Sequence, residues 1–591
     1  MRELSTKYYF VFNNHAGKAK ETLGFLKKLA PVLKLSNSHV LQKGIGTNKA
    51  EFVKALQSAV EALMSSSPKR MSIEAMAETA RQLGIQVDED IEQCQRASEY
   101  AKEITVQIKD VAKYKREKLR LQGEPWKNLA EVEKELCRMR NQGDIPLEKY
   151  KSQMKRKLLE LRVQQNKHDL TDGLTTFITG LGRLPPEEKH YFLKWMKFDL
   201  DHIARVNLSK LRDQYKEKCK NSKYDPREFA EHDKLISASS LGVEHFMREL
   251  GQFYEAEHAM VKEGKIAESQ RQFLHLPGIA ADLMLEGFPM ELIDGDVSNI
   301  PLQWVTDVLT QLHAKLGGRS RTLVLTVLGV QSTGKSTLLN TMFGLQFAVS
   351  IGRCTRGAFM SLIKVAENFQ QELGCDFILV IDTEGLKAPE LAKLEDSYEH
   401  DNELATLVVG LSDITIVNMA MENTTEMKDV LQIVVHAFLR MEEIGHKPNC
   451  QFVHQNVSDV SAHEQNMRDR KHLLEQMDEM TKAAANMEKK GREMKFSDIM
   501  DYDLEKHNWY IPGLWHGVPP MAPVNMGYSE NVYELKKYLF EFLKGCSQNR
   551  SPKDIPQFLE WVRSLWNAVK HENFISFRNS LIAEAYNQRC L

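Results

Sequence analysis

Hydrophobic residues in the first half of the chain recur at the spacing of an α-helix. Ile104, Ile108 and Val111 stand at positions i, i+4 and i+7 of one segment. Similar stripes recur within residues 129–139 and 150–161. Each stripe places its apolar residues on one face, which predicts an amphipathic helix. We therefore expect residues 1 to about 290 to be mostly helical.

Glycine and proline interrupt this helical pattern in three places. The interruptions lie at residues 123–125, 143–146 and 182–186. Because these residue types end helices, a long continuous coiled coil is disfavoured. Several helices packed antiparallel in a bundle are the simpler interpretation.

The pattern changes near residues 316–318, where apolar runs of strand length begin. Residues 321–330 read RTLVLTVLGV, and shorter runs follow at residues 362–365, 377–381, 414–417 and 451–454. Helical patterns separate these runs, and the chain is helical again from about residue 530. Fully apolar strands that alternate with helices predict a mainly parallel sheet with helices on both of its faces.

Length and composition limit the classes of protein. The chain has 591 residues, roughly four times an ordinary domain, so more than one folded unit is expected. Its 42% hydrophobic and 27% charged residues are typical of globular proteins. The 79 Lys and Arg residues against 81 Asp and Glu give a net charge of −2. This balance excludes a polycation built for nucleic acid, so we expect neither DNA nor RNA as a partner.

Cysteine usage and the N-terminus indicate the compartment. The eight cysteines are scattered and form no CxxC pair, and the histidines form no ligand cluster. Reduced thiols therefore fit better than a disulfide framework or a zinc site. The first residues lack the apolar core of a signal peptide, and no run approaches the ~18 apolar residues that cross a bilayer. We expect a soluble intracellular protein with no transmembrane segment.

A phosphate-binding motif follows the first predicted strand of the sheet. Residues 329–336 read GVQSTGKS and match G-x-x-x-x-G-K-[ST], directly before a helical run that begins at Thr337. Glycines let the main-chain N–H groups converge on phosphate oxygens at a helix N-terminus. The lysine suits the β- and γ-phosphates, and the serine hydroxyl suits Mg²⁺. The alternative is a chance glycine-rich turn. The candidate residues are Gly329, Gln331, Ser332, Thr333, Gly334, Lys335, Ser336 and Thr337.

Two further segments suit the metal ion and the γ-phosphate. Asp382 and Gly385 belong to an Asp-Thr-Glu-Gly sequence at the end of a predicted strand. The carboxylate can hold the Mg²⁺ shell through water, and the glycine N–H can approach the γ-phosphate. Thr355 lies between Arg353 and Arg356, and its hydroxyl could complete the Mg²⁺ coordination. The alternatives are an ordinary turn and a solvated basic turn.

A fourth segment predicts which base is bound. Asn456 and Asp459 have the spacing of an N-K-x-D motif, with Val457 in the place of the lysine. An aspartate there accepts hydrogen bonds from N1–H and the 2-amino group of guanine, whereas adenine would leave the carboxylate unpaired. Guanine is therefore the predicted base, and an Asx turn is the alternative.

Together these motifs resemble one known family. Residues 327–359, the DTEGL sequence and FVHQNVSD resemble the interferon-inducible very large GTPase family, which includes up-regulator of cell proliferation-like proteins. Residues 181–201 and 287–304 are similar to the same family. Members are generally longer, so the chain resembles a shortened form or a fragment. The resemblance implies a cytosolic or nuclear protein that binds GTP or GDP with Mg²⁺. Guanylate-binding proteins and dynamin-like GTPases are more distant relatives and imply a homo-oligomer formed through the GTPase domain.

The chain departs from these relatives at the residues that speed hydrolysis. Ser332 stands where guanylate-binding proteins have an arginine, and Leu386 stands where small GTPases have glutamine. The candidate catalytic residues are Lys335, Thr355, Arg353 and Arg356. Either arginine could supply the missing charge, within one molecule or across a dimer. Two hypotheses remain: a GTPase whose nucleotide state controls assembly, and a helical scaffold that binds GTP and hardly turns it over.

These observations predict a four-part organisation. We expect a helical bundle over residues 1–290, a linker over 291–318, an α/β P-loop GTPase domain over 319–545 and a helical region over 546–591. A helical insertion is expected at about residues 460–506, with core packing and partner binding as alternatives.

Residues 101–165 carry 17 Lys or Arg and 10 Asp or Glu. This excess suits either a solvated helix face or a face that binds phosphate or an anionic membrane. Residues 519–523 are a rigid loop where the base could be backed.

Overall fold

The structure is a computed structural model. It describes residues 10–12, 24, 27–28, 31, 40–42, 49–65, 73–85, 87–220, 226–331, 333–345, 347, 356–386, 395–420, 424–445, 447–457, 463–487, 494–515, 523–549 and 552–571. The chain divides into two compact units, Met1–Glu92 and Gln93–Leu591.

The first unit combines helices with one pair of strands. Strands β1 (Phe10–Phe12) and β2 (Val40–Gln42) pair in parallel. Helices α2 (Lys49–Ser65) and α3 (Ile73–Gln82) follow, and then the short 3₁₀ helix η3 (Asp88–Asp90). Three-residue apolar runs are too short to distinguish from helix by periodicity, so these strands were not predicted.

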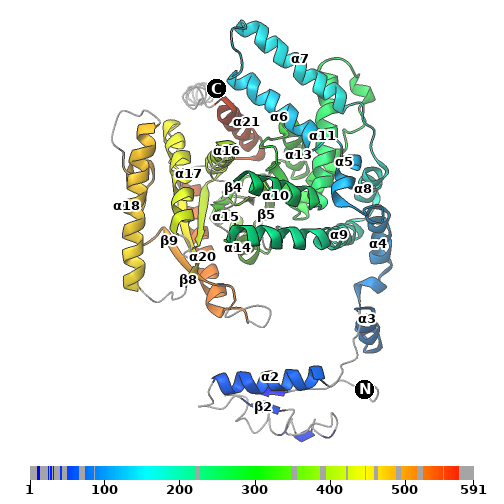
Figure 1. The fold of residues 1–591 in the computed structure, drawn as a ribbon, viewed down its shortest axis with the longest axis vertical. Coiled ribbons are helices and arrows are strands. Elements are labelled where there is room, and N and C mark those ends of the chain that lie inside the picture. The colour runs from blue at the N-terminus through cyan, green and yellow to red at the C-terminus, as the bar shows by residue number, and fades with distance from the viewer. Residues whose placement is uncertain are drawn as a thin grey trace. The chain divides into compact units, whose positions relative to one another are not determined.

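The second unit begins with a helical region, as its apolar periodicity predicted (Figure 1). The breaks between helices lie at the predicted glycine and proline positions. For example, α6 begins after Gly123, whose φ of 73° favours glycine, and α9 begins with Pro186. The helices are α4 (Glu92–Thr105), α5 (Val111–Lys118), α6 (Glu124–Arg138), α7 (Leu147–Gln165), α8 (Asp172–Arg183), α9 (Pro186–Lys220), α10 (Pro226–Ser239), α11 (Val243–Lys262) and α12 (Leu276–Leu285), with η4 (Glu268–Gln270) between the last two.

A seven-stranded mixed sheet forms the centre of the second unit, in the order β3-β5-β6-β4-β7-β8-β9. Its strands are β3 (Met290–Ile293), β4 (Thr322–Gly329), β5 (Ala358–Lys364), β6 (Phe377–Thr383), β7 (Ile414–Ala420), β8 (Cys450–Val457) and β9 (Asn508–Pro512). The neighbours from β6 through β4, β7 and β8 to β9 pair in parallel, whereas β5 is antiparallel to both β6 and β3. The mainly parallel α/β fold is thereby confirmed, with two strands, β3 and β9, that were not predicted.

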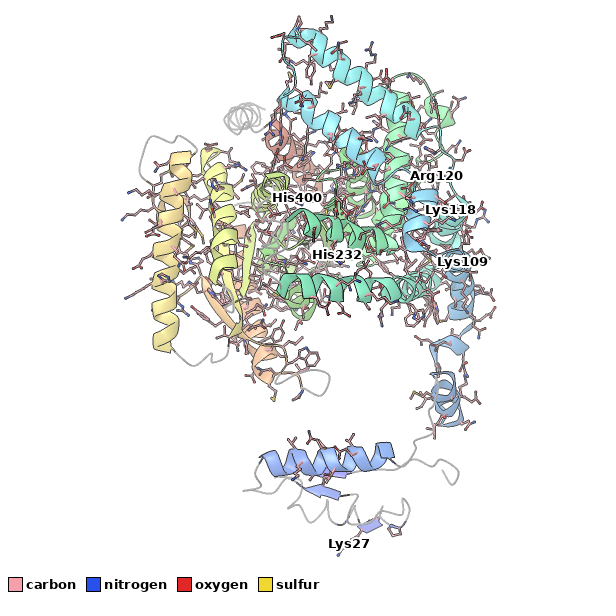
Figure 2. The ribbon with its side chains drawn as sticks, in the orientation of Figure 1. Lys27, Lys109, Lys118, Arg120, His232 and His400 are labelled. Carbon is pink, nitrogen blue, oxygen red and sulfur yellow. The ribbon has the colours of Figure 1, made fainter. Side chains whose placement is uncertain are left out.

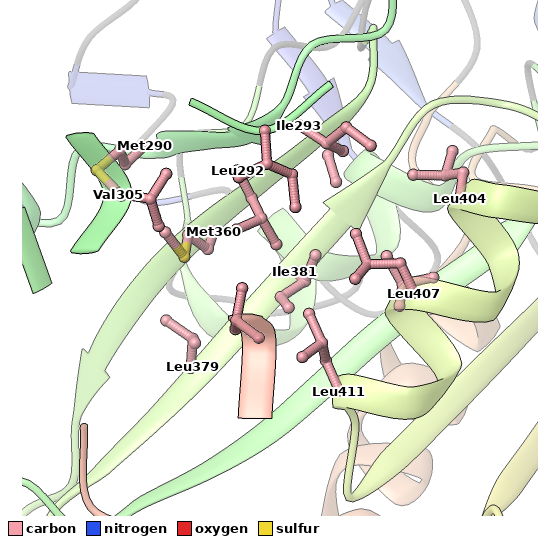
Figure 3. Close-up of a cluster of buried hydrophobic side chains, with 14 of the residues drawn as sticks. Met290, Leu292, Ile293, Val305, Met360, Leu379, Ile381, Leu404, Leu407 and Leu411 are labelled. Atoms are coloured by element: carbon pink, nitrogen blue, oxygen red, sulfur yellow. The ribbon is translucent and has the colours of Figure 1, made fainter. Parts of the chain in front are cut away.

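Helices cover both faces of this sheet and bury two separate apolar cores. On one face lie α14 (Lys335–Phe343), α15 (Glu367–Leu373) and α20 (Met526–Asn549). On the other lie α13 (Leu302–Lys315), α16 (Glu395–Leu411), α17 (Thr424–Glu443) and α21 (Ile555–His571). Figure 3 shows part of the second core, where Leu404, Leu407 and Leu411 of α16 face Ile381 of β6. Burial of this apolar surface is the main force that holds helices and sheet together.

The predicted helical insertion is α18 (His463–Met487), which lies beside α17 and is followed by α19 (Phe496–Ile499) (Figure 1). Leu473 and Met477 are 3% and 0% exposed and belong to the same core as α16 and α17. This stripe of α18 therefore packs inside the molecule. Over the part of the chain that the structure describes, no helix is long and apolar enough to span a membrane. The four predicted domain boundaries stay predictions.

Candidate nucleotide-binding site

The predicted motifs meet at one edge of the sheet. Gly329 ends β4, Asp382 lies near the end of β6, and Asn456 lies near the end of β8. Because these strands are parallel, their carboxyl ends share one edge, where ligands bind in open α/β sheets. Strands β4 and β8 are separated by β7 alone, so the two motifs lie roughly 10 Å apart across the sheet.

Two glycines permit the loop between β4 and α14. Gly329 has a φ of 151°, and a Cβ atom there would lie 1.9 Å from the main-chain oxygen of Asn418 on β7. No side chain fits at that distance. Gly334 has a φ of 80° and caps the N-terminus of α14. The chain therefore turns sharply and presents its N–H groups at a helix start, as a phosphate cradle requires.

Lys335 is the buried cation of this loop. Its Nζ donates to the main-chain oxygens of Gly329 at 3.1 Å and Val330 at 2.8 Å. Burial lowers the pKa of the Lys335 ammonium to about 8, although the carboxylates of Asp382 and Glu384 oppose that shift. A buried cation whose described hydrogen bonds go to two neutral oxygens is prepared to bind an anion.

A chain of side-chain hydrogen bonds holds the loop from β7 and β8. Thr333 Oγ1 donates to the oxygen of Val330 at 2.8 Å, and Asn418 Nδ2 donates to the oxygen of Thr333 at 2.9 Å. Gln455 Nε2 in turn donates to Asn418 Oδ1 at 3.1 Å. The sequence analysis missed Asn418 and Gln455. A polar residue near the carboxyl end of an otherwise apolar strand is the signal that could have found them.

Ser336 and Asp382 form the part of the site that suits a metal ion. Ser336 Oγ donates to Asp382 Oδ2 at 2.6 Å, and Asp382 is fully buried. Hard oxygen atoms of this kind are the ligands that Mg²⁺ prefers. Within the described ranges no three His, Cys, Asp or Glu side chains gather to hold a metal by themselves. The residues fit Mg²⁺ in its usual P-loop setting, where phosphate and water complete the coordination.

The Asp-Thr-Glu-Gly segment lies directly against the phosphate loop. A Cβ atom on Gly385 would lie 2.3 Å from Cα of Gln331, so the two main chains touch. The N–H of Leu386 donates to the oxygen of Gly329 at 3.0 Å. On the other side, the N–H of Glu384 donates to the oxygen of Gly357 at 2.7 Å. A shift of this segment is thereby coupled to the phosphate loop and to the start of β5.

Arg356, two residues before β5, is bound by an acidic side chain. Its Nη1 lies 2.5 Å from Asp296 Oδ1, and the arginine side chain is only 13% exposed. Asp296 also accepts from Ser237 Oγ of α10 at 3.0 Å and lies 4.0 Å from Arg248 of α11. Arg248 is held further by Asp294 at 3.2 Å. In this conformation Arg356 belongs to a polar cluster between the sheet and the helical region.

Glu384 connects the site to α16. It is fully buried, and its Oε1 contacts Nε2 of His400 on α16 (Figure 2). One turn further along α16, Glu403 pairs with Arg138 at 2.5 Å and with Lys134 at 2.8 Å, both on α6. The Asp-Thr-Glu-Gly segment, α16 and α6 are thus linked by consecutive side-chain contacts. Sequence reasoning missed Glu384, His400 and Arg138, because nothing in their spacing relates them.

Of the two predicted base-binding residues, the structure describes Asn456 and not Asp459. Asn456 is exposed and has a φ of 59°, which is uncommon for a residue other than glycine. Its Oδ1 would lie 3.7 Å from a Cβ atom on Gly513, just after β9. Thr337 lies in the first turn of α14. Ser332, Arg353, Thr355 and Asp459 lie outside the described residues, so their roles stay predictions.

A buried lysine on a glycine loop, a serine bound to an aspartate and a glycine touching the loop define a P-loop nucleotide-binding domain of the GTPase class. The family comparison agrees with this class. The URGCP-like GTPase domain matches residues 133–529, and the up-regulator of cell proliferation-like domain matches residues 1–105. The chain therefore belongs to the URGCP-like GTPase family, which confirms the predicted resemblance.

Individual relatives support the same assignment. Up-regulator of cell proliferation from Bos taurus is 47% identical over 96% of this chain and 60% of its own length. The Homo sapiens protein of that name is 46% identical with the same coverage. Interferon-induced very large GTPase 1 of Mus musculus is 39% identical over 90% of this chain and 22% of its own length. The chain spans about 60% of the length of the first two relatives.

Solved structures offer a weaker similarity. Toc33 from Arabidopsis thaliana, crystallised in complex with GDP and Mg²⁺, is 15% identical and covers 42% of this chain and 94% of its own. The TM-score is 0.25, a low overall similarity.

Proposed function

We propose that this protein binds a guanine nucleotide together with Mg²⁺ at the carboxyl edge of the sheet. One observation carries the proposal: the buried Lys335 ammonium donates to main-chain oxygens of the loop that would surround the phosphates. The family assignment supports it, since the matching domain is described as a GTPase domain.

Each motif residue then has a defined role. Lys335 leaves the main-chain oxygens and binds the β- and γ-phosphates, while the N–H groups from Gln331 to Ser336 surround the phosphate oxygens. The hydroxyl of Ser336 would bind Mg²⁺, and Asp382 would hold the metal through water. When bound, Mg²⁺ neutralises charge on the phosphate oxygens. Thr355 would complete the coordination, and Gly385 would donate its N–H to the γ-phosphate.

Guanine is the proposed base. Asn456 lies near the end of β8, and Asp459, three residues later, would accept from N1–H and the 2-amino group of the base. Because a buried carboxylate without its donors costs roughly 1–3 kcal/mol, GTP should bind roughly tenfold or more tightly than ATP.

We further propose that the chain hydrolyses GTP and self-associates through this domain. The charge that develops on the γ-phosphate needs a cation besides Lys335, and Arg353 and Arg356 are the candidates. Arg356 immediately precedes Gly357, whose oxygen accepts from Glu384. Its main chain therefore lies next to the segment that would contact the γ-phosphate. Either arginine could act on its own site or on that of a second copy.

A second candidate function is a GTP-binding scaffold with slow turnover. The observation that favours it is the engagement of Arg356 by Asp296, together with the apolar Leu386 at the position of the water-orienting glutamine. Both functions need the same nucleotide site and differ only in the rate of hydrolysis. The cytosolic and nuclear localisation that the family implies stays a prediction.

Nucleotide titrations test the binding site. Binding of a fluorescent GTP analogue with Mg²⁺ should weaken roughly 10- to 150-fold in Lys335→Ala, because hydrogen bonds to a charged group contribute about 1.5–3 kcal/mol. Lys364, an exposed lysine on β5, provides the matched control, and Lys364→Ala should bind as the wild type does. Equal affinity in Lys335→Ala and wild type, or equal affinity for ATP and GTP, would contradict the proposal.

Turnover separates the two candidate functions. GTP hydrolysis per molecule should be measured over a hundredfold range of protein concentration, with the oligomeric state followed in parallel. Specific activity that rises with concentration supports catalysis within an assembly. Tight GTP binding with negligible turnover at every concentration supports the scaffold.

A further inference from the structure

Strand β9 ends beside the proposed base site and is followed by an exposed aromatic residue. Pro512 of β9 pairs with Val457 of β8, the residue after Asn456. Trp515 follows three positions later, and its side chain is 47% exposed. Large aromatic side chains are usually buried to a greater degree. An exposed indole near a ligand-binding edge is therefore a candidate to contact the ligand.

The main chain at Leu514 and Trp515 pairs with residues 524 and 525. The residue forms an isolated antiparallel bridge with Val524, and the N–H of Asn525 donates to the oxygen of Leu514 at 2.8 Å. Gly513 connects this turn to the base site. A Cβ atom there would lie 3.7 Å from Asn456 Oδ1 and 3.9 Å from the main-chain oxygen of Trp515. Trp515 therefore lies two residues after a glycine that contacts the base motif.

The base motif itself lacks a residue that such a turn can replace. The lysine of an N-K-x-D motif packs its aliphatic stem on the base, and here the position is Val457, which is 9% exposed in β8. A buried valine offers nothing to the face of a purine. Asn456 has a left-handed φ of 59°, a strained conformation that often marks a ligand site.

We propose that Trp515 covers one face of the bound guanine base and so replaces the missing lysine of the motif. This inference rests on the proposed guanine-nucleotide site and adds a residue to it. An indole suits the role because its flat apolar face stacks on a purine ring, while Val524 and Met526, 51% and 78% exposed, enlarge the apolar surface nearby.

Affinity measurements test the contact with the base. Trp515→Ala should weaken GDP binding roughly 5- to 100-fold, the range observed when an aromatic residue stacked on a base is truncated. Trp515→Phe should retain most of the affinity, since a phenyl ring still stacks. Inorganic tripolyphosphate with Mg²⁺ carries no base, and its binding should be the same in wild type and Trp515→Ala.

A spectroscopic signal reports the contact directly. Stacking on guanine changes the emission of an indole, so titration of wild type with GDP should change the tryptophan fluorescence. The chain has seven tryptophans, and Trp515→Phe should remove the part of the change that Trp515 contributes. Tyr533 of α20, which is 64% exposed, provides a matched control. Tyr533→Ala should retain both the affinity and the fluorescence change.

Each result decides between the possibilities. Unchanged GDP affinity in Trp515→Ala would overturn the inference while leaving the nucleotide site intact. Equal losses for GDP and tripolyphosphate would also overturn it, because the residue would then support the loop rather than the base. A variant that loses self-association but binds GDP normally would assign the indole to a protein contact instead. Failure of the wild type to bind GDP at all would overturn the proposed function as well.

Discussion

Replacing Asp296 by asparagine should speed GTP hydrolysis. Asp296 holds the guanidinium of Arg356 at 2.5 Å, and an arginine held there cannot at the same time approach a γ-phosphate. Asparagine keeps the shape of the side chain and its accepting oxygen but removes the negative charge. The variant should therefore release Arg356 more readily without leaving a cavity.

The size of the effect follows from the environment of the pair. Hydrogen bonds between charged groups contribute about 1.5–3 kcal/mol when shielded from water, and surface ion pairs less than about 1 kcal/mol. The arginine side chain is 13% exposed and the aspartate 31%, so an intermediate value of about 1–2 kcal/mol is appropriate. If Arg356 must leave Asp296 before hydrolysis, removing this cost should raise turnover roughly 5- to 30-fold.

The assay is single-turnover GTP hydrolysis with enzyme in excess, so that product release does not limit the rate. It requires wild type, Asp296→Asn, Arg356→Ala and the double variant. Asp296→Asn should be faster than wild type, Arg356→Ala slower, and the double variant as slow as Arg356→Ala. Loss of the gain in the double variant would show that Asp296 acts through Arg356.

A neighbouring aspartate controls for general damage to the cluster. Asp294 lies 3.2 Å from Arg248 and is buried, but no contact joins it to Arg356 among those described. Asp294→Asn should therefore lower stability without raising turnover. Equal or slower hydrolysis in Asp296→Asn would refute the release of Arg356 as a limiting step, and an increase that persists without Arg356 would refute its role altogether.

Two further predictions concern charge. The pKa of Lys335 is about 8 in the nucleotide-free protein, and bound phosphate should raise it. Binding then takes up a proton above pH 8, and GDP affinity should fall about fourfold between about pH 7 and 8.5. Arg138→Ala should lower the free energy of unfolding by about 3–5 kcal/mol, because it leaves the Glu403 carboxylate buried and short of a cation.

A matched variant provides the control for the pH dependence of GDP binding and another for the loss of stability. Lys335→Ala should bind GDP weakly with no such fall over that range, and parallel pH profiles would contradict the assignment to Lys335. Arg140 also pairs with α16 but is 54% exposed, so Arg140→Ala should change the unfolding free energy, measured in urea, by about 1 kcal/mol or less. Similar losses in Arg138→Ala and Arg140→Ala would show that burial of the α6–α16 contact is unimportant.

The chemistry of the site could be predicted because its key residues are close in sequence. The loop from Gly329 to Ser336 has its own signature, and the strand before it and the helix after it supply the required context. The partners of that loop could not be predicted in the same way. Asn418 is 85 residues from Thr333, and Asp296 is 60 residues from Arg356. No local pattern relates residues at such separations.

The sequence by itself determined the class of domain, the phosphate loop and three of the breaks between helices, because glycine geometry and apolar periodicity act over a few residues. Only the tertiary structure decided that β5 runs antiparallel to β6, that β9 adds a strand at the far edge, and that Gly513, two residues before Trp515, lies beside Asn456. Strand direction and order depend on which apolar faces are buried together across the whole sheet, and a short run such as β9 acquires its conformation from its neighbour.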